Sequence, residues 1–138
     1  MWEASASCFI RGLVRNRKKM LLLVDDDNNQ LAMRRVILER LGYSVLTAGD
    51  AYRGMQLFKS EAPDAVVLDY EMPAINGGVL AERIRRANCS IPIVMLSACG
   101  SVPTRFLKAV NTFICKPTAP SCLINAIEFL TRSREVAA

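Results

Sequence analysis

Acidic side chains, a hydroxyl and a lysine each follow a short apolar run of this sequence. In chain order they are Asp25 with Asp26 and Asp27, then Asp69, Ser97 and Lys116. In an open parallel sheet the carboxyl ends of the strands share one edge, and ligands bind at that edge where the strand order reverses. If the apolar runs are parallel strands, these side chains meet.

Such a meeting calls for a cation. Two carboxylates about 4 Å apart repel by roughly 1 kcal/mol in water and about 4 kcal/mol at an effective dielectric constant of 20. The chain has no histidine and no paired thiolates, so its hard oxygen ligands favour Mg²⁺ or Mn²⁺. The metal and Lys116 would neutralise a phosphoryl group, Ser97 would donate a hydrogen bond to it, and one aspartate would attack phosphorus.

From residue 20 onward, short β-prone runs alternate with stretches of helical period, which is typical of a doubly covered parallel sheet. The runs are apolar on both faces, as expected when helices cover both sides. The predicted strands are 20–24, 44–48, 65–68, 93–96 and 112–115. The predicted helices carry the apolar stripes Met33, Ile37, Leu41; Ala51, Met55, Phe58; Leu80, Ile84, Ala87; Val102, Phe106, Val110; and Leu123, Ile127, Leu130. The pattern predicts an α/β fold of five βα units.

Length, charge and cysteine content narrow the class of protein. The 138 residues suit one domain, and no apolar run reaches the roughly 18 residues of a membrane span. The net charge of +5 divides into +4 for residues 1–19 and +1 for the remainder, so no direct nucleic-acid binding is expected. The five cysteines, without a C-x-x-C pair, indicate reduced, mostly buried thiols and a cytoplasmic protein.

Four motifs then carry a family resemblance. The segments LLLVDDDNNQ, AVVLDYEMPAINGG, IVMLSA and FICKP together resemble the receiver domain of two-component response regulators, the CheY-like family, over residues 20–132. Residues 1–19 would be a flexible basic extension, and residues 133–138 a short C-terminal tail. The resemblance implies a flavodoxin-like fold with strand order 2-1-3-4-5.

The resemblance also implies roles for individual residues. Asp69 matches the phosphoacceptor, which takes a phosphoryl group from a sensor histidine kinase or a phosphotransfer protein. Asp25 and Asp26 match the acidic pair that holds Mg²⁺ together with Asp69 and the main-chain carbonyl of Glu71. Further matches are Ser97, Ala98 and Lys116 for phosphoryl binding, Ser97 with Phe113 for the switch, and Pro117 for a cis peptide bond. Kinase specificity would lie on the first helix, around 31–41.

Two departures from the family pattern bear on output. Asn76 stands where the family usually has aspartate, which keeps a turn former and loses a charge. The segment from Ser97 to Lys116 is short and contains Pro103, so the fourth helix is expected to be shortened. Because that face is the family's usual output surface, a homodimer carried over by analogy stays open.

The expected function is a stand-alone, non-enzymatic receiver that depends on Mg²⁺ and signals to an unidentified downstream protein through a changed surface. One alternative is a degenerate receiver that binds partners without phosphorylation. Another is an aspartate-nucleophile phosphohydrolase of the haloacid dehalogenase kind, which Asp69-Tyr70-Glu71 fits poorly. Asp27 by itself fits a helix cap better than a metal ligand.

Overall fold

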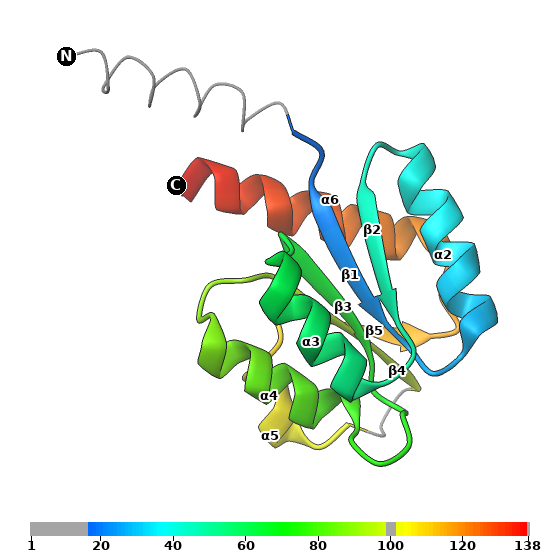
Figure 1. Ribbon diagram of the computed structural model, residues 1–138, viewed down its shortest axis with the longest axis vertical. Coiled ribbons are helices and arrows are strands. Elements are labelled where there is room, and N and C mark those ends of the chain that lie inside the picture. The colour runs from blue at the N-terminus through cyan, green and yellow to red at the C-terminus, as the bar shows by residue number, and fades with distance from the viewer. Residues whose placement is uncertain (1–16, 99–101, 138) are drawn as a thin grey trace.

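A five-stranded parallel sheet forms the centre of the computed structural model, which describes residues 17–98 and 102–137 (Figure 1). The strand order is β2-β1-β3-β4-β5, as expected. The strands are β1 (Met20–Val24), β2 (Ser44–Ala48), β3 (Ala65–Asp69), β4 (Ile93–Ala98) and β5 (Thr112–Lys116). The helices are α2 (Asn28–Arg40), α3 (Ala51–Glu61), α4 (Gly77–Ala87), α5 (Thr104–Leu107) and α6 (Pro120–Ala137).

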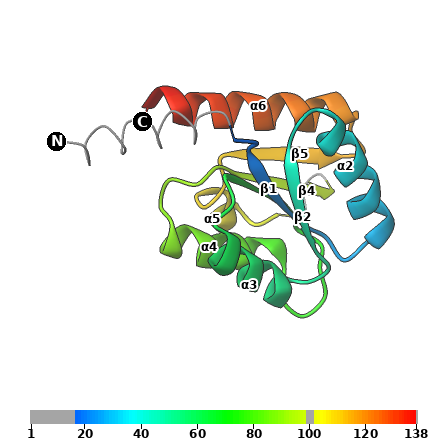
Figure 2. The same cartoon turned by 45° about the horizontal axis from the view of Figure 1, so that its top comes forward.

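Helices cover both faces of the sheet, as Figure 2 shows, with α2 and α6 on one side and α3, α4 and α5 on the other. Two hydrophobic clusters follow this division. One joins the sheet to α2 and α6 through Leu31, Leu38 and Ile127, and the other joins it to α3 and α4 through side chains such as Phe58 and Ile84. Burial on both faces explains why the strands are continuously apolar.

All five predicted strands are confirmed, and three of them are longer than predicted. β3 continues to Asp69, β4 to Ala98 and β5 to Lys116. The acceptor candidate, Ser97 and the lysine are therefore strand residues rather than loop residues. Backbone pairing fixes Asp69 opposite Leu96 and Ser97 opposite Cys115.

The apolar stripe predicted for α2 is wrong. Met33 is 48% exposed and Leu41 lies beyond the last residue of the helix, whereas Leu31 and Leu38 are buried. Arg34 lies between these two leucines on the same helical face, since residues three and four apart are neighbours. The face that turns inward thus carries a cation, which hides it from a search for apolar periodicity.

The fourth helix of the fold, α5, is only four residues long, so the expected shortening is confirmed. Pro103 precedes it, and Phe106 anchors it with a side chain that is 1% exposed. The Phe106 ring lies so close to Gly78 that a Cβ atom there would come within 2.4 Å of it. A single turn of helix is thereby packed against the start of α4.

The chain ends differ in how much the structure describes. Residues 1–16 of the basic extension lie outside the described residues, and Arg17 forms an exposed ion pair with Asp64 at 3.1 Å. The expected tail is largely helical, because α6 runs to Ala137. Within 17–98 and 102–137, none of the helices is both long and apolar enough to cross a bilayer.

Of the described cysteines, two are reduced as expected but exposed instead of buried, and one is not reduced. Cys89 and Cys122 are free thiols, but both are exposed. Cys115 on β5 is disulfide-bonded. Cys8 and Cys99 lie outside the described residues.

Candidate functional site

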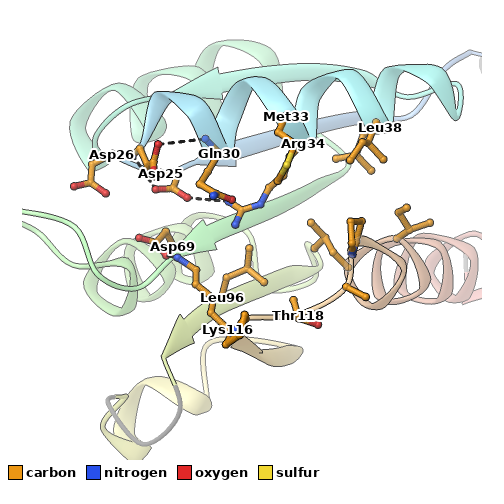
Figure 3. Close-up of a pocket in the computed structure, with 17 residues that line it drawn as sticks. Asp25, Asp26, Gln30, Met33, Arg34, Leu38, Asp69, Leu96, Lys116 and Thr118 are labelled. Carbon is orange, nitrogen blue, oxygen red and sulfur yellow. Dashed lines mark hydrogen bonds and ion pairs between the residues drawn. The ribbon is translucent and has the colours of Figure 1, made fainter.

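Three carboxylates converge where β1 and β3 end. Asp25 and Asp26 directly follow β1, and Asp69 is the last residue of β3; one oxygen of each lies within 4.8 Å of the others (Figure 3). Asp25 and Asp69 are buried at 2% and 3% exposure, whereas Asp26 is exposed. The adjacent parallel strands, β1 and β3, are what bring acids separated by more than forty positions together.

Asp25 is held from two sides. One of its oxygens accepts from the backbone N–H of Asp27 at 2.9 Å, and the other accepts from the Arg34 guanidinium at 2.8 Å (Figure 3). The Arg34 side chain is only 13% exposed, so this ion pair is shielded from water. Sequence reasoning missed Arg34; its signal was a lone cation between Leu31 and Leu38 on an inward face.

Asp27 has a different task from its two neighbours. Its side chain accepts hydrogen bonds from the backbone N–H groups of Asn29 and Gln30, so it is the N-cap of α2. The capping interpretation of Asp27 is confirmed. The cap fixes where α2 begins, which in turn places Arg34 two turns along, over Asp25.

Asp69 forms an ion pair with Lys116, the last residue of β5. Burial raises the pKa of Asp69 to about 6, the Lys116 ammonium opposes that rise, and the negative charges of Asp25 and Glu71 add to it. The ionised carboxylate is therefore disfavoured where it stands, even with one cation in contact. Additional positive charge at this edge would stabilise it.

Glu71 closes the other side of the site. Its carboxylate accepts hydrogen bonds from the Ser97 hydroxyl and, at 3.0 Å, from the backbone N–H of Ala98. Ser97 is fully buried at 0% exposure, whereas Glu71 and Ala98 are exposed. The family resemblance implied the main-chain carbonyl of Glu71 as a metal ligand, and the contacts of its side chain were not foreseen.

The loop after Asp69 is fixed by close packing. A Cβ atom on Gly77 would lie 2.2 Å from the carbonyl oxygen of Asp69, so only glycine fits at this first position of α4. The Asn76 side chain accepts from the backbone N–H of Val79 at 3.0 Å and caps α4. Asparagine therefore does keep the local turn, as its turn-forming chemistry predicts.

The remaining predicted residues lie on or after β5. Phe113 is half-buried, pairs with Met95 of β4 and packs against the cluster that joins the sheet to α3 and α4. The peptide bond between Lys116 and Pro117 is cis. The switch role assigned to Phe113 stays a prediction, as does metal binding by the Glu71 carbonyl.

A cleft of about 650 Å³ opens beside the acids. It runs between α2 and the segment that joins β5 to α6, and its lining passes from Asp26 and Lys116 to the apolar side chains of Met33, Ile37 and Ile124. The site is thus charged at the sheet edge and apolar along α2. A protein side chain or a small donor can approach Asp69 from here.

The donor set suits a magnesium ion. Three carboxylates offer hard oxygen ligands within 4.8 Å of one another, and Asp26 is open to solvent. Magnesium prefers oxygen ligands and commonly retains water molecules, which the exposed side of the cluster leaves room for. Two of the three acids already have a cation, Arg34 on Asp25 and Lys116 on Asp69, which leaves the cluster one negative charge in excess.

Comparison with known proteins agrees with this geometry. The family model described as "Response regulator receiver domain" matches residues 21–128. The probable transcriptional regulator ycf27 of Cyanophora paradoxa is 36% identical over 112 residues, which are 77% of this chain and 46% of that protein. The alkaline phosphatase synthesis transcriptional regulatory protein PhoP of Bacillus subtilis (strain 168) is 30% identical over 73% of this chain and 43% of its own length. The chain therefore spans less than half the length of these curated relatives.

Solved structures give the same fold. A CheY-like response regulator receiver domain protein from Methanospirillum hungatei JF-1 has a TM-score of 0.81 at 26% identity, covering 88% of this chain and 99% of that one. Response regulator protein TrrA of Thermotoga maritima, solved in complex with Mg²⁺-BeF, has a TM-score of 0.77 at 28% identity, covering 81% of this chain and 98% of that one. With the family match over residues 21–128 and the acidic strand-end site in place, this chain belongs to the response regulator receiver domain family.

Proposed function

We propose that this receiver domain accepts a phosphoryl group on Asp69 and signals through a change of its surface. The observation that supports this most strongly is the setting of Asp69, which is buried, contacts Lys116 and lies within 4.8 Å of the carboxylates of Asp25 and Asp26. This is a nucleophile surrounded by the charges that phosphoryl transfer requires.

In the proposed reaction, a carboxylate oxygen of Asp69 attacks phosphorus and forms a new P–O bond. The P–N bond of the donor phosphohistidine breaks, and the imidazole leaves with the electron pair. Lys116 stabilises the transferred oxygens by charge, and Asp25, fixed by Arg34, keeps the acidic pair in place. When bound by Asp25, Asp26, Asp69 and the Glu71 carbonyl, Mg²⁺ would offset the charge of the phosphoryl group.

Receiver domains take phosphoryl groups from histidine kinases, and we place the donor at the cleft beside α2. The cleft leads to Asp69, and the exposed side chains of Met33 and Val36 lie on the same helix. The cleft and these two exposed side chains fit the expectation that residues 31–41 select the sensor kinase or phosphotransfer protein. The proposal puts the reaction in the cytoplasm, where such donors act.

The output is assigned to the face around β5. Phosphorylation would engage Ser97 and shift the half-buried Phe113, and the shortening of α5 to a single turn would bear on the same output face. Because the chain spans less than half of its curated transcriptional-regulator relatives, the stand-alone organisation, the homodimer and the downstream protein partner stay predictions.

A degenerate receiver is the second candidate. The observation that favours it is that the Glu71 carboxylate already engages the donors of Ser97 and Ala98. Such a chain would bind partners without gaining a phosphoryl group.

Intact mass spectrometry after incubation with acetyl phosphate and Mg²⁺ tests the proposal. We expect the chain to gain one phosphoryl group, and we expect Asp69→Ala or a chelator to abolish the gain. If neither acetyl phosphate nor beryllofluoride with Mg²⁺ modifies or binds the chain, the degenerate receiver replaces the proposal. Repeated turnover of generic phosphate esters would instead identify a phosphohydrolase.

A further inference from the structure

The strongest unassigned feature is the side chain of Glu71, two residues beyond the acceptor. A single carboxylate oxygen, Oε1, accepts both the Ser97 hydroxyl and the Ala98 backbone N–H. Both donors come from the last two residues of β4, and Ser97 is completely buried. Two donors that converge on one anionic oxygen at a strand end make a small anion site, and the protein fills it with its own carboxylate.

The chemistry of that oxygen matches the group that the site would receive. Hydroxyl and backbone N–H donors aimed at one point are what stabilise a phosphoryl oxygen, and hydrogen bonds to a charged acceptor are stronger than those to a neutral one. A carboxylate oxygen is the nearest equivalent that a protein side chain offers. Ser97 is also the residue that phosphorylation would engage in the proposed function.

Charge makes the two occupants mutually exclusive. Asp69 pairs across the sheet with Leu96, the residue before Ser97, so the Glu71 carboxylate that binds Ser97 and Ala98 lies on the same edge as the acceptor. A phosphoryl group on Asp69 would bring further negative charge toward the same donors, and like charges at a few ångströms repel. Glu71 is exposed, so its side chain has solvent to move into.

Resting on the proposed function, we infer that the Glu71 carboxylate occupies the phosphoryl position of the unphosphorylated chain and must leave it when Asp69 is phosphorylated. Glu71 is a positioning residue in this account. It holds the Ser97 hydroxyl and the Ala98 N–H in the arrangement that the phosphoryl group later takes over. Phosphorylation then replaces the Glu71 carboxylate by the phosphoryl group as the acceptor of the Ser97 hydroxyl, which already has a partner before phosphorylation.

The test compares the wild type with Glu71→Ala, Glu71→Gln and the matched control Glu61→Ala. Glu61 is also an exposed glutamate, at the end of α3, and its replacement makes the same charge change. All four proteins are titrated with beryllofluoride at saturating Mg²⁺ while the Ala98 amide is followed by NMR. The substitutions at 71 keep the main-chain carbonyl.

We expect Glu71→Ala to bind beryllofluoride about fivefold to tenfold more tightly than the wild type, with Glu71→Gln between them and Glu61→Ala within about twofold of the wild type. Before any ligand is added, the Ala98 amide proton should move upfield in Glu71→Ala and stay in place in Glu61→Ala. A structural role alone would not give this pairing of a local shift with tighter anion binding.

Equal beryllofluoride affinity for wild type and Glu71→Ala, or an unmoved Ala98 amide in Glu71→Ala, would overturn the inference while leaving phosphorylation of Asp69 intact. Failure of every variant to bind beryllofluoride would instead overturn the proposed function, and this inference with it.

Discussion

The metal side and the switch side of this site differ in how their polar groups are satisfied. On the metal side, at the end of β1 and the start of α2, the Asp25 carboxylate is fixed by Arg34 and by the backbone N–H of Asp27. On the switch side, at the end of β4, the donors of Ser97 and Ala98 are satisfied by the Glu71 carboxylate. Asp69 and Lys116 lie between the two sides.

The two sides are therefore ready for their ligands in different ways. The metal side has three acids close together and one uncompensated negative charge, so a cation can be added there without displacing another anion. The switch side has its donors in place but occupied, so an anion can enter only by replacing another. Binding of the metal and arrival of the phosphoryl group should therefore be separable events.

The largest expected effect comes from removing the cation that the two sides share. Lys116→Met keeps a long apolar side chain but removes the ammonium that contacts Asp69. We expect labelling by acetyl phosphate to slow by about 10-fold to 100-fold. Timed intact-mass measurements would show it. Lys59→Met, an exposed lysine on α3, is the control and should label at the wild-type rate. Unchanged labelling in Lys116→Met would contradict its place at the centre of the site.

Arg34→Gln breaks the metal side. The buried Asp25 carboxylate loses its charged partner, so unfolding in urea without metal should cost about 2 kcal/mol less than for wild type. Arg35→Gln removes the neighbouring guanidinium from a surface ion pair with Glu39 and should change stability by no more than about 0.5 kcal/mol.

Magnesium provides a second readout for the same pair. Mg²⁺ should raise the melting temperature of Arg34→Gln by more than that of wild type, because the ion takes over the compensation of Asp25. A smaller rise in Arg34→Gln than in wild type would show that Arg34 helps to hold the metal instead of competing with it.

Asp69→Asn tests the electrostatic cost of the shared acceptor. The pKa of Asp69 is raised from 3.8 to about 6, so the folded chain retains a proton that the unfolded chain has released, and stability falls as the pH rises through this window. Above pH 6 Asp69 is ionised, and its buried charge destabilises the folded chain. Asp69→Asn should therefore be more stable than the wild type by roughly 1–2 kcal/mol at pH 7.5 without metal. Urea denaturation at pH 7.5 and 3.5 would measure it. The gain should shrink to about 0.2 kcal/mol at pH 3.5, where the folded state is protonated and the unfolded state is mostly protonated, and a gain of full size there would refute this cause.

The smallest effect on stability is expected from the N-cap of α4, which follows the loop after Asp69. Asn76→Ala removes the side chain that accepts from Val79 at the start of α4, and we expect a loss of about 1 kcal/mol in unfolding free energy. The midpoint of Mg²⁺ binding should stay unchanged, because the acids are held by strands. A shifted Mg²⁺ midpoint would mean that the two sides are coupled through this loop.

The strand-end acids and the fold were predictable because they rest on local patterns. Runs such as 20–24 and 65–68 are apolar on both faces, and the residue types that follow them determine the chemistry. The acidic cluster of Asp25, Asp26 and Asp69 required only the rule that parallel strands end at one edge. The resemblance added the individual roles, which the geometry alone leaves as proposals.

The contacts of Arg34 and Glu71 were not predictable in the same way. Arg34 turns inward because Asp25 lies beneath it, which reverses the usual placement of a charged residue and misled the choice of stripe on α2. Glu71 reaches Ser97 across a loop whose path depends on the close packing of Gly77 against the Asp69 carbonyl. Both depend on long-range side-chain geometry, which periodicity does not encode.

The most direct test of the account follows the wild-type amides of Asp27 and Ala98 by NMR through two additions, first Mg²⁺ and then beryllofluoride. The account predicts that Mg²⁺ moves the Asp27 amide, which donates to Asp25, and leaves Ala98 near its starting shift until beryllofluoride displaces Glu71. A complete shift of Ala98 on Mg²⁺ alone, or none after beryllofluoride binds, would contradict the separation of the metal side from the switch side.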